Sequence, residues 1–313
     1  MRVTALAGGI GAGKFLRGLL RAVAPSDVTV IVNTADDVQM HGLHVSPDLD
    51  SVTYWLGDVF DRERGWGRRD ETFRATEELR RFDPDAAWFN LGDLDLATHL
   101  FRTRRLAEGR TLTEVTAEVA ARFGVAARVL PMSDDPVATR VTVLALVREL
   151  DLHFQEYWVH RRAQDEVKHV RYAGAEVARP APGVLEAIAE ADALVICPSN
   201  PVASIRPILA VPGIRAALQT RRAVVVGISG IVGGAPLAGM ADKLMPALGV
   251  EVTAAGAADA YRGLLGAWVI EETDRHLASR IESSGVRVGA TDTIMRDDEA
   301  AEALARFALD LLR

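Results

Sequence analysis

The chain has 313 residues, of which 49% are hydrophobic and 25% charged, and its formal net charge at pH 7 is −7. An acidic chain of ordinary composition argues against non-specific nucleic-acid binding, and no apolar run is long enough to span a bilayer. The one cysteine excludes an internal disulfide and a cysteine-rich zinc site. We therefore expect a cytoplasmic protein that binds neither nucleic acid nor a membrane.

The first residues predict a turn that binds phosphate. An apolar run, Val3–Ala7, leads directly into the glycine-rich stretch 8–14, and a strand, glycine turn and helix present backbone N–H groups to anions. The stretch completes neither familiar nucleotide loop. Phe15 replaces the magnesium-binding Ser or Thr of the triphosphatase loop, and Lys14 replaces the third glycine of the dinucleotide loop. We expect a nucleotide or diphosphate to contact the backbone of Gly9, Gly11 and Gly13, with any metal held elsewhere.

Short β-rich runs alternate with helical stretches along the whole chain, which predicts an α/β fold with a doubly wound, mostly parallel Rossmann-like sheet. Polar or glycine-rich residues follow each run, so one crevice should form at the carboxyl ends of the strands. The predicted strands are Val3–Ala7, Val28–Asn33, Ala86–Phe89, Ala127–Leu130, Ala193–Cys197, Ala223–Ile228 and Val286–Gly289.

Residues 137–178 interrupt this rhythm. Two candidate strands, Val141–Val147 and Val167–Arg171, flank an aromatic and charged stretch, His153–Arg161. We predict a single domain with a Rossmann-like core at about 1–136 and 179–313 and a small inserted subdomain at about 137–178. Amphipathic spacing predicts helices at Asp70–Arg81, Thr111–Phe123 and Ala300–Leu312.

Two pairs of carboxylates follow the second predicted strand. Asp36 and Asp37 lie in the loop after residues 28–33, and Asp48 and Asp50 come shortly afterwards. Carboxylate oxygens suit a hard cation, and Asp48 and Asp50 point the same way if their segment is extended. The alternative is that these residues cap turns and a helix that begins near Leu49.

Two further segments offer ligand-binding side chains. Asn90, Asp93 and His99 belong to a dense polar cluster after the third predicted strand. The alternatives are a helix cap for Asp93 and a partly buried helical position for His99. The segment from Trp66 to Arg69 joins an aromatic ring to two guanidinium groups, which suits a ring or an anion. A solvated helix start is the alternative there.

A fifth strand end carries the sequence Cys-Pro-Ser-Asn-Pro at residues 197–201. Ser199 and Asn200 can donate hydrogen bonds to a phosphate or to the edge of a base. Cys197 is expected to be a buried residue with no activated thiolate.

These motifs, in this order, resemble those of the 2-phospho-L-lactate and phosphoenolpyruvate transferases of coenzyme F-420 biosynthesis. The resemblance runs from about Val3 to Thr293 and covers nearly the whole chain. The segments that carry it are Gly-Gly-x-Gly at 8–11, Asn-Thr-x-Asp-Asp at 33–37, Pro-Asp-Leu-Asp at 47–50, residues 91–99, Ser-Asp at 133–134, and residues 197–201.

The resemblance implies an enzyme that transfers a phosphoenolpyruvyl or 2-phospho-L-lactyl group to the deazaflavin Fo. The donor is a guanosine diphosphate that carries the three-carbon acid, and the products are GMP and coenzyme F-420-0 or its dehydro form. It also implies a homodimer. We expect Mg²⁺ at Asp37 and Asp50, which would be the catalytic carboxylates, with Asp48 as the alternative ligand.

The remaining candidates divide between the two substrates. Ser199 and Asn200 are assigned to the nucleotide, and the backbone of residues 9–13 to the diphosphate. The residues assigned to the deazaflavin or the carboxylate arm are Asn90, Asp93, His99 and the segment from Trp66 to Arg69, and Asn33 completes the ligand-binding set.

Three alternatives stay open at this point. A nucleotide-binding regulatory protein of the same fold would lack transferase activity. A nucleoside-phosphate kinase is disfavoured by Phe15, and an NAD-dependent oxidoreductase is disfavoured by the interrupted glycine pattern. Only three of the 36 basic residues are lysines, which indicates a GC-rich genome and favours the enolpyruvyl donor that family members in such bacteria use.

Overall fold

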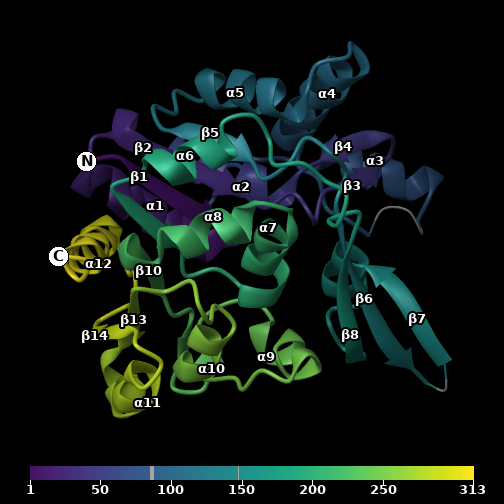
Figure 1. The fold of residues 1–313 in the computed structure, drawn as a ribbon. Coiled ribbons are helices and arrows are strands. Elements are labelled where there is room, and N and C mark those ends of the chain that lie inside the picture. The colour runs from purple at the N-terminus through teal and green to yellow at the C-terminus, as the bar shows by residue number, and fades with distance from the viewer. Residues whose placement is uncertain (85–87, 147) are drawn as a thin grey trace.

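The computed structural model describes residues 1–84, 88–146 and 148–313. A seven-stranded sheet forms the centre, and all its neighbouring strands pair in parallel (Figure 1). The predicted doubly wound, Rossmann-like architecture is thereby confirmed. In spatial order the strands are β14 (Arg287–Thr291), β13 (Ala267–Glu271), β10 (Val225–Ile228), β9 (Ala193–Ile196), β1 (Val3–Ala7), β2 (Val28–Val32) and β5 (Arg128–Pro131).

Six of the predicted strands take their places in this sheet, and one does not. Residues 86 and 87 of the predicted strand Ala86–Phe89 lie outside the described residues, and Trp88 and Phe89 belong to a turn and a bend. The seventh strand is instead β13, a fully buried run of five residues that the sequence analysis missed.

Helices cover both faces of the sheet because alternate strand residues point in opposite directions. Val3, Ala5 and Ala7 pack under one layer of helices, whereas Leu6 packs under the other. The first layer contains α1 (Gly9–Ala22), α2 (Pro47–Leu56), α5 (Leu112–Arg122) and α12 (Asp298–Asp310). The second layer contains α6 (Val184–Glu190), α7 (Arg206–Ala210), α8 (Ile214–Thr220), α9 (Ala241–Leu244), α10 (Ala254–Asp259) and α11 (Ala278–Glu282).

Three strands between residues 138 and 173 form a separate antiparallel sheet that projects to one side of the molecule (Figure 1). Its strands are β6 (Ala138–Ala145), β7 (Arg148–His153) and β8 (Glu166–Ala173). Val141 and Val143 on β6 are fully buried in the same apolar cluster as the second helix layer. The inserted sheet is therefore packed onto the core and is not an independent unit.

Two short ribbons and two further helices complete the described chain. Two small two-stranded ribbons pair β3 (Val38–Met40) with β4 (Leu43–Val45) and β11 (Ile231–Val232) with β12 (Ala235–Pro236). Helices α3 (Arg74–Phe82) and α4 (Asp93–Ala107) lie near the first ribbon. Among the described helices, no single one is long and apolar enough to cross a membrane; one bent pair, Pro201–Ala210 with Ile214–Thr220, passes a test of length and composition alone.

The strand order reverses at β1. From β1 the chain proceeds through β2 to β5 on one side, and then returns to β9 and continues to β14 on the other. In parallel sheets such a switch point leaves a crevice at the carboxyl ends of the two central strands, and ligands bind there. The turns after β1 and β9 must therefore border any ligand site.

The first test of this arrangement is the contact between those two turns. A Cβ atom added to Gly11 would lie 2.4 Å from the carbonyl oxygen of Pro198, which is backbone and cannot swing aside. We predict that Gly11→Ala lowers the free energy of unfolding by about 1–3 kcal/mol, as overpacking does. Urea denaturation measures the change.

The matched control is Gly230→Ala. The nearest atom to a Cβ at Gly230 is the same carbonyl oxygen of Pro198, at an ordinary 3.6 Å. This variant should change the free energy of unfolding by less than about 0.5 kcal/mol. An equal loss of unfolding free energy in both variants would show that the close contact between Gly11 and Pro198 does not cause the destabilisation.

Candidate functional site

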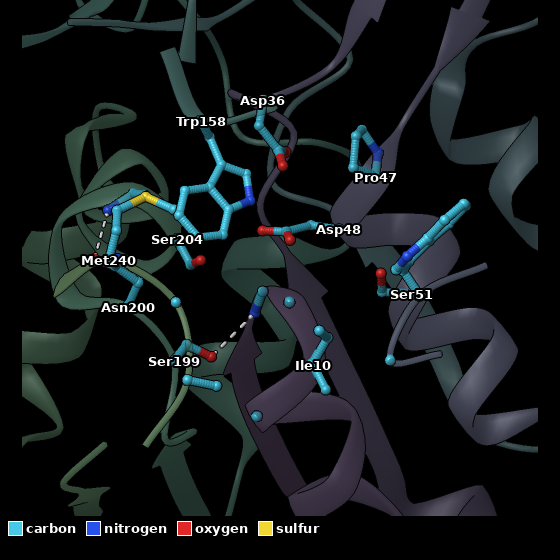
Figure 2. Close-up of a pocket in the computed structure, with 18 of the residues that line it drawn as sticks. Ile10, Asp36, Pro47, Asp48, Ser51, Trp158, Ser199, Asn200, Ser204 and Met240 are labelled. Carbon is cyan, nitrogen blue, oxygen red and sulfur yellow. Dashed lines mark hydrogen bonds between the residues drawn. The ribbon is translucent and has the colours of Figure 1, made fainter. Parts of the chain in front are cut away.

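A cavity of about 760 Å³ occupies the predicted crevice. The turn after β1, the acidic loop after β2 and the start of α2 form its floor, and the turn after β9 forms one wall (Figure 2). The insert contributes Gln155 and Trp158, which follow β7 of the inserted sheet, and Gln155 contacts the acidic loop at Asp36. One cavity thus draws on both halves of the sheet and on the insert.

The glycine turn brings backbone close to this cavity. Gly8 N donates to Ser199 Oγ at 3.2 Å, which ties the turns after β1 and β9 together. A Cβ at Gly8 would lie 2.3 Å from Asp48 Oδ2, so the glycine makes room for that carboxylate. Gly9 and Gly11 line the cavity, but Gly13 does not, because it packs against the indole of Trp55.

Asp36 and Asp48 are neighbouring carboxylates on the cavity floor. Figure 2 shows both side chains projecting into the space beside Trp158. The Asn33 amide links them, since its Nδ2 lies 2.9 Å from Asp48 Oδ2 and 3.3 Å from Asp36 Oδ1. Within the described chain, neither carboxylate has a Lys, Arg or His within ion-pair distance.

Without a bound cation, negative charge on Asp36 and Asp48 is unfavourable. Burial raises the pKa of Asp36 well above its usual value, and the negative charges of Asp48 and Asp37 raise it further. Burial also raises the pKa of Asp48 to about 7, although hydrogen bonds from Asn33, the Gly9 backbone and Ser204 oppose the rise. Two carboxylates in this state are the natural ligands of a cation supplied from outside.

Asp37 and Asp50, the two carboxylates expected to be catalytic, have polar or charged partners on neighbouring elements, although Asp37 Oδ1 is buried with no hydrogen-bond partner among the described residues. Asp37 does not line the cavity, and its Oδ2 accepts from His44 Nε2 at 2.9 Å and from Ser46 Oγ at 2.8 Å. Asp50 lines the cavity, but both its oxygens accept hydrogen bonds from the buried guanidinium of Arg102.

Helix geometry explains why Asp48 and Asp50 diverge. The segment is not extended, as the sequence analysis supposed, but forms the first turn of α2. Residues two apart on a helix lie on different faces. Asp48 therefore faces the glycine turn, whereas Asp50 faces Arg102 and His99 on α4.

The other predicted ligands also fall into two groups. Asn90, His99, Trp66, Ser199 and Asn200 line the cavity. Asn33, Arg69 and Asp93 do not line the cavity, and each has a structural partner. Asn33 donates to the acidic pair, and Arg69 donates to the backbone oxygen of Asp58. Asp93 accepts from the backbone N–H groups of Arg74 and Ala75 at the start of α3. Asp93 does not cap α4, because Glu71 accepts from the first backbone amides of that helix.

His99 is part of a buried network rather than a free side chain. It lies in the second turn of α4. Its ring nitrogens lie 3.6 Å from carboxylate oxygens of Asp50 and Asp95, and Tyr54 donates to Asp95 at 2.6 Å. The burial of the Asp95 carboxyl favours a higher pKa, but the contacts with His99, Tyr54 and Arg102 outweigh it and lower the pKa.

Several cavity residues escaped the sequence analysis. Gln155 and Trp158 come from a stretch recognised only as aromatic and charged, and Ser204 lies beyond the recognised turn. Lys14, an exposed residue, also lines the cavity and is its only lysine or arginine among the described residues. No periodicity marks these positions; only the fold brings them together.

The residues present fit a magnesium ion shared with a ligand. Among the described residues, no group of three or more His, Cys, Asp or Glu side chains could hold a metal alone. Mg²⁺ is commonly bound by one or two carboxylates together with substrate phosphates and water. Asp36 and Asp48 supply such a pair, beside the backbone amides of the glycine turn.

Comparison with known proteins gives the family. The model of the family described as 2-phospho-L-lactate transferase CofD matches residues 3–306. A protein named phosphoenolpyruvate transferase from Streptomyces griseus is 50% identical over 312 residues, covering 99% of this chain and 98% of that protein. Proteins of the same name from Thermobifida fusca and Mycolicibacterium smegmatis are 45% and 42% identical, each again covering 99% of this chain and 98% of the relative.

A solved structure supports the fold alone. The chain is similar to a member of the UPF0052 family from Bacillus halodurans, with a TM-score of 0.63 and 17% identity, covering 98% of each chain.

Removing the partner of Asp50 should lower the stability of the protein, whereas neutralising Asp48 should not. Arg102→Met leaves the buried Asp50 without its counter-charge, which costs about 3–5 kcal/mol of stability in comparable cases. We predict a loss of that size in urea denaturation. A loss below about 1 kcal/mol would mean that Asp50 does not depend on Arg102 and is available to bind a metal.

Asp48→Asn is the contrasting variant. It removes a buried charge that no cation balances, so at pH 8 in the presence of EDTA the variant should be at least as stable as the wild type. A clear loss of stability would show that Asp48 has a structural partner instead of a ligand-binding role. Both variants are compared in the same denaturation experiment.

Proposed function

Because the chain belongs to the 2-phospho-L-lactate transferase CofD family, we propose that it transfers a phosphoenolpyruvyl group from enolpyruvyl-diphosphoguanosine to the deazaflavin Fo. Phosphoenolpyruvyl or phospholactyl transfer in coenzyme F-420 biosynthesis is the activity of the family and of this enzyme. The proposal adds the acceptor, the guanosine-linked donor, and the products GMP and dehydro coenzyme F-420-0. The name shared by its relatives, phosphoenolpyruvate transferase, favours the enolpyruvyl donor over the lactyl donor.

The observation that carries the proposal is the uncompensated pair Asp36 and Asp48 beside the glycine turn. A donor diphosphate placed at this turn would meet the backbone N–H groups of α1 and the positive end of its dipole. Asp36 and Asp48 would hold Mg²⁺ next to it. When bound, the ion would neutralise negative charge on the diphosphate as the phosphorus is attacked.

The chain's own residues would align the two substrates. The reaction joins the terminal ribityl hydroxyl oxygen of Fo to the β-phosphorus while the bond from that phosphorus to GMP breaks; the GMP oxygen keeps the electron pair, and the hydroxyl proton is released. Such in-line transfer needs positioning and charge stabilisation and no covalent enzyme intermediate. Lys14, on the second turn of α1, adds a positive charge at the cavity for the anionic donor.

The aromatic residues suit the acceptor. Trp66 and Trp88, from the chain between α2 and α4, and Trp158, from the insert, line the cavity. Their flat faces match a tricyclic deazaflavin by stacking. We therefore place Fo on this side, and the guanosine near Ser199 and Asn200 after β9.

Asn200 offers a test of this division. Its Oδ1 accepts from the backbone of Val202 and Ala203, so Nδ2 is the group that can donate to a nucleotide. Asn200→Asp keeps the local acceptor but replaces the donor with a negative charge. We predict at least a ten-fold rise in KM for the guanosine-linked donor with an unchanged KM for Fo. A rise confined to Fo would mean that the two sides are interchanged.

The direct test is an endpoint assay read by mass spectrometry. Purified protein is incubated with Fo, Mg²⁺ and, in parallel, enolpyruvyl- or lactyl-diphosphoguanosine. We expect GMP and the phosphodiester product, with the enolpyruvyl donor preferred. Asp48→Asn should lower the rate by about 100-fold or more, because a charge-stabilising group is lost. Asp27→Asn, on the surface, is the matched control and should retain activity.

Two results would contradict the proposal. Full activity of Asp48→Asn would remove the acidic pair from the reaction. Clear nucleotide binding with no product from either donor would favour a nucleotide-binding regulatory protein of the same fold.

A further inference from the structure

Gln155 connects the inserted sheet to the acidic pair. It lies between β7 and the short helical segment Glu156–His160, and it is 4% exposed. Its Nε2 donates to Asp36 Oδ2 at 3.0 Å, although the two residues are 119 positions apart in the chain. The mechanism described above leaves this buried amide without a role.

Gln155 is the principal donor to Asp36. The other amide near this carboxylate, Asn33 Nδ2, has two hydrogens and three acceptors: Asp48 Oδ2 at 2.9 Å, Asp36 Oδ1 at 3.3 Å and the Ala203 oxygen at 3.3 Å. Asn33 therefore serves Asp48 first. Asp36 depends on Gln155 for its shorter hydrogen bond, and that bond occupies one lone pair of Oδ2 only.

The insert holds Gln155 in a fixed place. Its neighbours Phe154 and Tyr157 are buried in the main apolar cluster. A second hydrogen bond joins the insert to the acidic loop, from Thr139 N to the Ala35 oxygen at 2.6 Å. Packed residues on both sides therefore hold the Gln155 amide in place, so it does not have to become ordered when a ligand binds.

We propose that Gln155 is a positioning residue that orients the Asp36 carboxylate for a divalent cation shared with Asp48. The inference rests on the proposed function, since it assumes that Asp36 and Asp48 hold the metal. The amide fixes the rotation of the carboxylate and leaves its remaining lone pairs for the cation. Hydrogen bonds of this kind to metal ligands change metal affinity or activity by about 10–100-fold when removed.

The test measures Mn²⁺ binding to protein in the presence of GDP, which supplies the diphosphate that shares the ion, by the electron paramagnetic resonance signal of free Mn²⁺, with GDP alone as the blank. Gln155→Met keeps the approximate shape of the side chain and removes the amide. We expect it to bind Mn²⁺ at least ten-fold more weakly than the wild type. Gln155→Asn, whose amide is one methylene too short to reach Asp36, should show a similar loss. Circular dichroism checks that both variants fold.

Tyr157→Phe is the matched control within the insert. The Tyr157 hydroxyl is buried and has no hydrogen-bond partner among the described residues, so its removal should leave Mn²⁺ affinity unchanged. In the transfer assay, Gln155→Met should require at least ten-fold more Mg²⁺ for half-maximal rate. Its kcat at saturating Mg²⁺ should stay within about three-fold of the wild type, because the carboxylates themselves are intact.

The possible failures are distinguishable. Wild-type affinity in both Gln155 variants overturns the positioning role while the proposed function stands. A loss of Mn²⁺ affinity in Tyr157→Phe equal to that in Gln155→Met also overturns it, because the effect would then come from packing of the insert. A wild-type protein that transfers the group but binds no Mn²⁺ overturns both the metal site and the role of Gln155, and leaves the reaction itself in place.

Discussion

Two buried carboxylates without a balancing cation are the constraint around which the site is built. Asp36 and Asp48 face one cavity and share the amide of Asn33. The cost of bringing them together is reduced only by neutral donors, namely amides, a hydroxyl and backbone N–H groups. Such an arrangement is unfavourable for the protein alone and favourable once a cation and an anionic ligand are present, which supports a role in binding and not in stability.

The neighbouring buried charges have the opposite character. Asp50 is matched by Arg102, and Asp95 by contacts with His99 and Tyr54, so these carboxylates stabilise the junction between α2 and α4. One helical turn thus carries the carboxylate that we propose binds the cation and a structural carboxylate two residues apart. Helix periodicity separates their roles, because it turns Asp48 toward the glycine turn and Asp50 toward α4.

The fold was largely predictable from the sequence, and the site was predictable only in part. Apolar runs followed by polar turns identified six strands of the sheet and the edge at which the cavity lies. The run that became β13 was overlooked, although its five residues are fully buried. The acidic loop was found, but the choice among its carboxylates depended on partners such as Arg102 and His44, which are distant in sequence. Gln155 reaches Asp36 only through tertiary packing, so no local pattern predicts it.

The most direct test of the metal site is the anomalous diffraction of crystals grown with Mn²⁺ and GDP. The account predicts one anomalous peak within ligand distance, about 2.0–2.3 Å, of carboxylate oxygens of both Asp36 and Asp48, with the diphosphate completing the coordination. A peak at Asp37 or Asp50, or a diphosphate bound in the cavity with no metal beside it, would contradict the account.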